Sequence, residues 1–130
     1  MSEAAAHTWE SLVLGESASL QKLISKEDIA AFATLSGDKN PLHVEDGVVH
    51  GMYLGALVSN LVGMQLPGER ALLMKESLSF KKPVHAGDTV CLTATLTHKS
   101  EATHVIELAL TARVGERIVA EGEVLCQVRL

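Results

Sequence analysis

The chain has 130 residues, of which 47% are hydrophobic and 21% charged, and its formal net charge is −5. This length and composition fit one domain with an ordinary apolar core, and the scattered Lys and Arg residues form no basic stripe, which argues against a nucleic-acid-binding protein. Aromatic residues make up only 3%, so Leu, Val, Ala, Ile and Met must build the core.

The first elements predicted along the chain are a strand and a capped helix. Residues 1–16 are expected to form a loose lead-in, and residues 17–24 a first strand. Ser25 suits the N-cap of a helix, and Asp28 three residues later completes a capping box. Gly37 is expected to end this helix. Its buried face is expected to consist of Ile29, Phe32, Ala33 and Leu35.

A polar loop, residues 38–43, is expected to follow, because Pro41 prevents the helix from continuing. Polar loops next to helices often carry functional residues. Asp38 and His43 are the residue types of a general acid–base pair, whereas the Asn40 amide would orient groups rather than transfer protons. In the alternative interpretation Asp38 only forms an Asx-turn and His43 is a structural histidine.

A second helix, apolar nearly all round and therefore buried, is predicted to begin near His50 and to end at Gly63 and the Leu-Pro-Gly sequence after it. Its apolar residues recur at helical spacing: Leu54, Leu57, Val58, Leu61 and Val62. Gly51 would let a backbone N–H approach a ligand at the helix start, or would simply permit tight packing. His50 could support this loop, and a zinc site with Asp38 and His43 would lack the spacing of a helical metal motif.

The remainder of the sequence predicts antiparallel strands. They are expected at residues 71–80, 89–98, 104–113 and 117–129, with alternating apolar positions in the middle two. Gly115 and Glu116 predict a hairpin turn, and Gly122 a bulge. A curved sheet wrapped around the apolar helix buries both apolar faces, so we expect an α+β fold in a single domain, residues 1–130.

The two cysteines and the apolar stretch 52–66 bear on the cellular location. Cys91 and Cys126 lie in apolar runs without CxxC or metal-ligand spacing, so we expect reduced packing residues. The stretch 52–66 is too short to span a membrane, and the N-terminus lacks the apolar core of a secretory signal. These features predict a cytoplasmic protein.

Five segments occur in an order that resembles the MaoC-type (R)-specific enoyl-CoA hydratases, which have the hot-dog fold: FATLSGDKNPLH, VVHGM, QLPG, SLSFKKPV and GDTV. The resemblance runs from about Ser25 to the C-terminus. It implies reversible syn addition of water to a trans-2-enoyl thioester, giving the (R)-3-hydroxyacyl thioester. It also implies acyl-CoA or acyl carrier protein as the bearer of the substrate, no cofactor, no metal, and a homodimer or higher oligomer with sheets joined edge to edge.

The resemblance assigns roles to five residues, which are Asp38, Asn40, His43, Gly51 and Ser59. Asp38 and His43 match the catalytic pair, and Gly51 matches the glycine whose N–H meets the thioester carbonyl. The expected substrate-binding residues are Asn40, His50, Ser59 and Val62. Lys81 and Lys82 are expected contacts for the phosphates of CoA.

The sequence departs from the family at residues 44–49, because members carry a clearly longer segment there that helps to cover the site. The short segment predicts either a more open acyl pocket or impaired activity. Two other enzymatic functions are alternatives to the CoA hydratase: a dehydratase acting on acyl carrier protein and a hot-dog acyl-CoA thioesterase. The short segment also makes plausible a non-catalytic module that binds acyl thioesters.

Overall fold

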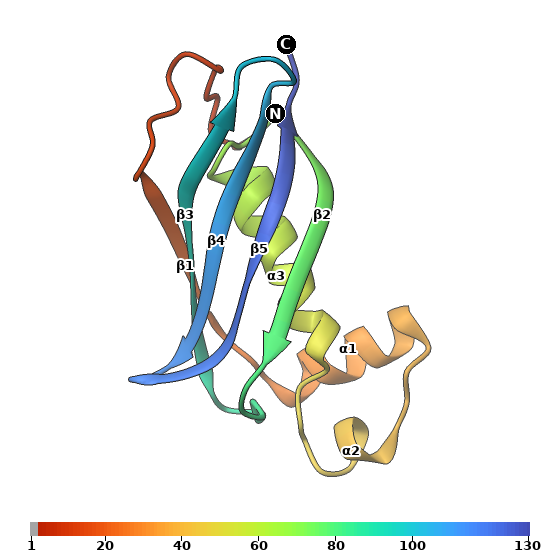
Figure 1. Cartoon of the computed structure of the whole chain (residues 1–130). Helices are drawn as coiled ribbons and strands as arrows, with labels where there is room; N and C mark the ends of the chain where they lie inside the picture. Colours follow the sequence, from red (N-terminus) through yellow and green to blue (C-terminus); the bar gives the residue numbers. More distant parts are fainter. Residues whose placement is uncertain (1–2) are drawn as a thin grey trace.

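The computed structural model describes residues 3–130, and its elements form one antiparallel sheet wrapped around a central helix (Figure 1). The strands pair in the order β1-β3-β4-β5-β2. Helix α3 lies across one face of the sheet, and α1 and α2 lie together at one end of it. The elements are β1 (Ser17–Leu23), α1 (Lys26–Ser36), α2 (Pro41–Val44), α3 (Gly51–Met64), β2 (Ala71–Phe80), β3 (Thr89–Ser100), β4 (Val105–Val114) and β5 (Arg117–Val128). The predicted hot-dog fold of the α+β class is confirmed.

The core lies between α3 and the inner face of the sheet. Alternate residues of β3 point inward and are buried, as the alternation predicted, and they are Val90, Leu92, Ala94 and Leu96. Ile106, Leu108 and Leu110 of β4 continue the same layer. Helix α3 contributes Val58 and Leu61 to this core. Burial of these apolar side chains fixes the register of the sheet, because a slip by one residue would turn each of them outward.

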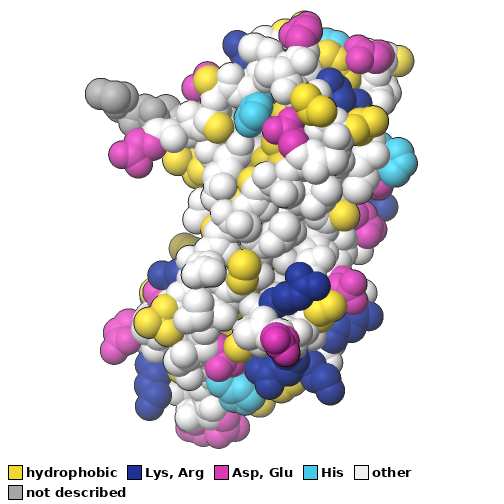
Figure 2. All heavy atoms as spheres, turned by 90° about the vertical axis from the view of Figure 1, so that its left-hand side faces the viewer, with side chains coloured by type: hydrophobic (Ala, Val, Ile, Leu, Met, Phe, Trp, Pro, Cys, Tyr) yellow, Lys and Arg dark blue, Asp and Glu magenta, His cyan; other side chains and the backbone are white. Residues whose placement is uncertain are grey.

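Positively and negatively charged side chains are intermingled on the surface of the protein. On the face shown in Figure 2, Lys and Arg side chains gather toward the lower end with Asp and Glu among them. The middle of this face is mostly uncharged. Within residues 3–130, no helix is long and apolar enough to cross a membrane.

Helix α1 has the predicted capping box. The Ser25 Oγ accepts a hydrogen bond from the Asp28 N–H, and an Asp28 carboxylate oxygen accepts one from the Ser25 N–H, each at 3.0 Å. The Ser25 N–H lowers the pKa of Asp28, with smaller contributions from the Ser25 hydroxyl and from Lys22. Gly37 ends the helix with a φ of 84°, a left-handed conformation that favours glycine.

Replacing Ser25 by Ala is expected to lower the free energy of unfolding by about 1 kcal/mol, because the Asp28 N–H loses its acceptor. Urea denaturation followed by circular dichroism measures the change. Ser19→Ala, at an exposed position of β1, is the matched control and should change the free energy of unfolding much less. Equal losses in the two variants would show that the capping box contributes nothing.

Two expectations for residues 35–43 were wrong. Leu35 is 84% exposed, because two residues after buried Ala33 a helix has turned by about 200°. Residues 38–43 are not all loop, since Pro41 begins the short helix α2. A proline fits the first turn of a helix because its missing N–H would have no helical partner there.

Helix α3 has the predicted position but is not buried all round. Met52 is 65% exposed, and Ala56, Ser59 and Asn60 are exposed as well. These residues lie on the side of the helix that faces away from the sheet core. The helix therefore has one buried face and one face of small and polar residues open to the surroundings.

The N-terminal segment is anchored rather than loose, because Trp9 and Leu12 are buried in the core. The Lys99 Nζ donates to the carbonyl oxygens of both residues, each at 2.8 Å, and lies 4.6 Å from the centre of the Trp9 ring. A half-buried ammonium with two acceptors and an aromatic face holds this segment against the end of the sheet.

Two expectations for the strands concern the glycine Gly122 and the cysteines Cys91 and Cys126. Gly122 is not at a bulge, because it pairs in register with Leu78, and the shifts in register occur elsewhere in the sheet. Both cysteines are free, as expected, but only Cys126 is buried, while Cys91 is half-buried. Burial raises the pKa of the Cys126 thiol to about 11, so it remains protonated at neutral pH.

Glu76 of β2 packs against Gly55 of α3, and burial raises the pKa of its carboxyl group. A raised pKa in the folded protein means that this group favours folding most at low pH, and that this contribution is lost as the pH rises through the folded pKa. Glu76→Gln is therefore expected to raise the melting temperature more at about pH 7 than at about pH 4. Thermal denaturation at both pH values measures this difference. Glu123→Gln, at an exposed position of β5, should show no such dependence.

Candidate active site

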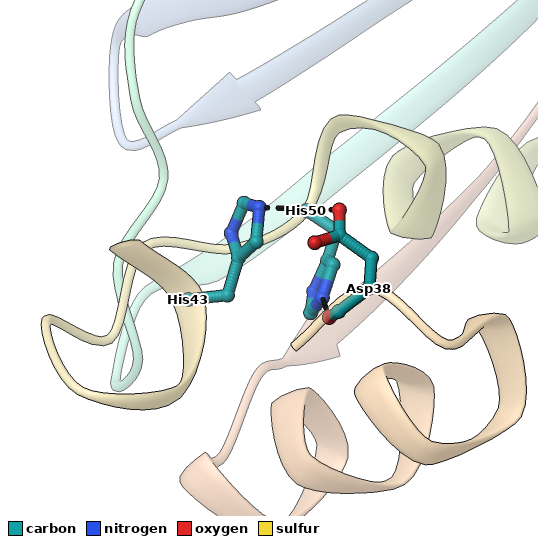
Figure 3. Close-up of side chains that lie close together, drawn as sticks. All are labelled: Asp38, His43 and His50. Atoms are coloured by element: carbon teal, nitrogen blue, oxygen red, sulfur yellow. Dashed lines mark hydrogen bonds and ion pairs between the residues drawn. The ribbon is translucent and has the colours of Figure 1, made fainter. Parts of the chain in front are cut away.

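Asp38 and His43 face each other at the end of the molecule where α1, α2 and α3 meet (Figure 3). The His43 Nε2 lies 3.6 Å from an Asp38 carboxylate oxygen. The Asp38 side chain is 52% exposed and that of His43 is 13% exposed, so solvent reaches the pair from the carboxylate side. The two residues that sequence reasoning paired are thus brought together, each able to contact the same small molecule.

Hydrogen bonds orient both members of this pair. The His43 Nδ1 lies 2.7 Å from the Val48 carbonyl oxygen, which can only accept, so Nδ1 donates to it and Nε2 faces Asp38. One Asp38 oxygen accepts from the Asn40 N–H at 3.2 Å, forming the expected Asx-turn. The other oxygen faces His43. Asp38 therefore forms the Asx-turn with one oxygen and faces His43 with the other, and its catalytic role stays a prediction.

Asn40 has a local role in building the site. Its side-chain oxygen accepts a hydrogen bond from the Leu42 N–H at 2.9 Å and so caps α2. Helix α2 carries His43 in its single turn. The amide therefore positions His43 through the backbone of α2, and the expected contact of Asn40 with substrate stays a prediction.

Gly51 is the first residue of α3, and a cleft of about 350 Å³ lies beside it. The first N–H groups of a helix have no acceptor within the helix, and the helix dipole favours negative charge there. The cleft is lined by Leu42, His43, Val48, Val49, Gly51, Leu54, Phe80, Lys81, Lys82, Pro83 and Val84. An apolar cleft that reaches both His43 and a helix N-terminus can hold an acyl group with its carbonyl at the N–H.

His50 lies behind the pair and is 2% exposed. Its Nε2 lies 2.9 Å from the Asp38 carbonyl oxygen, and its ring stacks on His43 with centroids 3.8 Å apart and planes 18° apart. Asp38, His43 and His50 bring potential ligand atoms within 4.8 Å of one another. A zinc ion sits about 2.0–2.1 Å from an imidazole nitrogen along its in-plane lone pair, and two stacked rings cannot both direct such lone pairs to one ion. This arrangement suits acid–base chemistry better than metal binding.

Ser59 and Val62 are not brought to this cleft. Along α3 they lie about 12 Å and 16 Å beyond Gly51. Ser59 is exposed on the outer side of the helix, and Val62 is buried in the core. Their expected contacts with substrate stay predictions.

Sequence reasoning missed Phe80 at the site. A Cβ atom added to Gly51 would lie 3.0 Å from the Phe80 ring, so this ring covers the start of α3. Phe80 is the last residue of β2, and the strand pattern gave no sign that it reaches the helix. The Phe80 ring reaches the start of α3 because β2 pairs with β5 at the edge of the sheet.

The short segment 44–49 forms a compact turn. The Gly47 N–H donates to the His43 carbonyl at 3.1 Å, and the Val48 N–H to the Leu42 carbonyl at 3.1 Å. The Val49 N–H then donates to the Val84 carbonyl at 2.7 Å, which ties the turn to the segment before β3. The turn also places the Val48 carbonyl that orients His43. A short connection therefore still brings His43 to Asp38.

Residues 14–118 match the MaoC like domain family. The chain is 39% identical to an (R)-specific enoyl-CoA hydratase of Rhodospirillum rubrum, over 90% of this chain and 88% of the relative. It is 32% identical to a 3-hydroxybutyryl-CoA dehydratase of Methylorubrum extorquens, over 92% and 83% of the two chains. The structure of the (R)-hydratase from Aeromonas caviae superposes with a TM-score of 0.87 at 35% identity, covering 92% of this chain and 98% of that one. This chain therefore belongs to the MaoC-like domain family.

Proposed function

We propose that the chain is a hydro-lyase that adds water reversibly to trans-2-enoyl-CoA and forms the (R)-3-hydroxyacyl-CoA. The observation that carries the proposal is the Asp38–His43 pair, 3.6 Å apart, whose His43 lines a largely apolar cleft together with Gly51 at the N-terminus of α3. The named relatives, at 32–39% identity over most of the chain, support the same reaction.

In the proposed mechanism one water molecule lies between Asp38 and His43. The Asp38 carboxylate oxygen and the His43 Nε2 are both acceptors, and each can hold a water oxygen at about 2.8 Å. As the water oxygen bonds to Cβ, one of the two groups takes its proton, and a proton is delivered to Cα from the same side. A single water thus supplies both the hydroxyl and the hydrogen, in a syn addition.

Negative charge develops on the thioester oxygen when water attacks Cβ. The Gly51 N–H, with the N-terminus of α3 behind it, would donate to this oxygen as the enolate forms. The donor is fixed by the helix before the reaction begins, so it needs no rearrangement in the transition state. Such a donor typically contributes about 3–4 kcal/mol to lowering the barrier.

The CoA portion would leave the cleft on the side of Lys81 and Lys82. Both lysines line the cleft and follow directly after Phe80. Ammonium groups at the rim suit the phosphates of CoA, while Leu42, Val49 and Leu54 suit the acyl chain.

A spectrophotometric assay with crotonyl-CoA and octenoyl-CoA tests the proposal and measures the preferred chain length. Chiral analysis of the product should give the (R)-3-hydroxyacyl-CoA. The same substrates on acyl carrier protein distinguish the two bearers. Free thiol released from saturated acyl-CoA would instead indicate a thioesterase, and tight binding without turnover a non-catalytic module.

The proposed quaternary structure is a homodimer joined along β2. This strand is at the edge of the sheet and exposes Leu72 and Met74, and an exposed apolar edge strand is a ready surface for pairing with a second copy. The double variant Leu72→Lys/Met74→Lys is expected to shift the protein from dimer to monomer in sedimentation velocity at micromolar concentration. Ala109→Lys, at an exposed position of β4, should leave the dimer intact. A wild-type monomer would contradict this proposal.

A further inference from the structure

We propose that His50 is a positioning residue of the reaction, which holds both members of the catalytic pair at the tip of α3. The inference rests on the proposed function and adds a residue that contacts neither the water nor the substrate in that mechanism. Three independent contacts of the His50 ring carry it, and each fixes a different part of the site.

The first contact is with the backbone of Asp38. The His50 Nε2 lies 2.9 Å from the Asp38 carbonyl oxygen, and since a carbonyl can only accept, Nε2 donates. This bond joins two segments twelve residues apart in the sequence and lies within the protein, where water competes little with it. It holds the peptide of Asp38 against the start of α3, so the carboxylate cannot drift away from Gly51.

The second contact is with the catalytic ring itself. The rings of His50 and His43 stack with centroids 3.8 Å apart and planes 18° apart. Among residues 3–130, the only hydrogen bond to the His43 ring runs from Nδ1 to the Val48 carbonyl, and rotation of the ring about its Cβ–Cγ bond would break it and turn Nε2 away from Asp38. A flat ring packed on its face prevents this rotation.

The third contact fixes His50. The edge of its ring meets Phe32 of α1, with centroids 4.9 Å apart and planes 61° apart. His50 is also the N-cap residue of α3, directly before Gly51. The His50 ring therefore contacts the backbone of Asp38 and the ring of His43, and His50 itself directly precedes the Gly51 N–H.

The His50 Nδ1 is buried and has no hydrogen-bond partner among the described residues. A buried polar atom without a partner costs stability and calls for an explanation. An amide side chain could also donate to the carbonyl, but it has no ring to stack on His43. A flat ring that donates from Nε2 to Asp38 leaves Nδ1 without a partner at this position.

Two substitutions separate the two tasks of the ring. His50→Phe keeps an aromatic face on His43 and removes the donor to Asp38, whereas His50→Gln keeps an N–H donor and removes the ring. We expect kcat to fall about 10- to 100-fold in each, with KM within about threefold, because a shift of about 1 Å in a catalytic group can cost 100-fold. His98→Phe and His98→Gln are matched controls at an exposed histidine far along β3, and should leave kcat unchanged.

Nitrogen NMR of His43 provides a readout that does not depend on turnover. In the wild-type protein the His43 Nδ1 should carry the proton, and in His50→Gln the two nitrogens should share it as the ring becomes mobile. Unchanged kcat per folded molecule and unchanged His43 signals, with only a lower melting temperature, would overturn the inference. If the wild-type protein does not hydrate enoyl-CoA, the proposed function fails, and the NMR comparison still decides whether His50 positions His43.

Discussion

Asp38→Asn and His43→Gln are each expected to lower kcat for enoyl-CoA hydration at least 100-fold. Each variant keeps the size and most of the hydrogen bonds of the original residue but cannot exchange a proton readily. General acid–base catalysis typically contributes 10²- to 10⁴-fold, so the loss of either partner should lie in this range. Because the two groups act on the same water molecule in the proposed mechanism, the double variant should lose little more than the single ones.

The fold should survive both changes. Asp38 is half exposed, and Asn can still accept the Asn40 N–H that forms the Asx-turn. Melting temperatures measured beside the initial rates check this. Asp46→Asn, in the turn after α2, is an exposed control for loss of charge and should keep its activity. Hydration of crotonyl-CoA at nearly the wild-type rate by either catalytic variant would rule out the pair.

The sheet could be predicted from sequence because its register follows from alternation. In β3 and β4 every second residue is apolar, and only one assignment places all of them inside. The capping box and Gly37 likewise fix the ends of α1 through local hydrogen bonds. The proximity of Asp38 and His43 was predictable for the same reason, since the turns between them hold the two residues together.

The remaining features depend on contacts between distant segments. Trp9 contacts Lys99, which lies ninety residues away in the sequence. Phe80 reaches Gly51 because β2 lies at the edge of the sheet beside β5. Burial on α3 is one-sided because the sheet covers one side only, although the sequence of the helix is apolar nearly throughout. Local patterns carry no information on such partners, so these features appear only when the chain is folded.

The motif residues form a site because three short elements end at one point. Gly37 ends α1 and releases Asp38, Asn40 starts the turn of α2 that carries His43, and His50 caps α3. Each of these ends is a cap, with backbone groups that need partners from outside the helix. The same local chemistry that ends the helices thus gathers the polar groups used in the proposed reaction.

Gly51→Pro is expected to lower kcat about 100- to 1,000-fold relative to Gly51→Ala. Proline has no N–H, so it deletes the proposed donor to the thioester oxygen, and loss of one such donor typically costs this factor. The backbone should tolerate the change, because proline is favoured at the first position of a helix and His50 has an extended ψ of 136°, as a residue before proline requires.

Gly51→Ala serves as the matched control for the steric effect. Both variants add a Cβ near the Phe80 ring, at 3.0 Å from its nearest atom, and this ring must move by a few tenths of an ångström in each. The proline variant also replaces the N–H by the ring carbon Cδ, so the ratio of the two kcat values measures the loss of the donor together with the presence of the ring. If the two variants are equally active and equally stable, the enolate charge is stabilised by some other group, and the helix N-terminus serves only to shape the cleft.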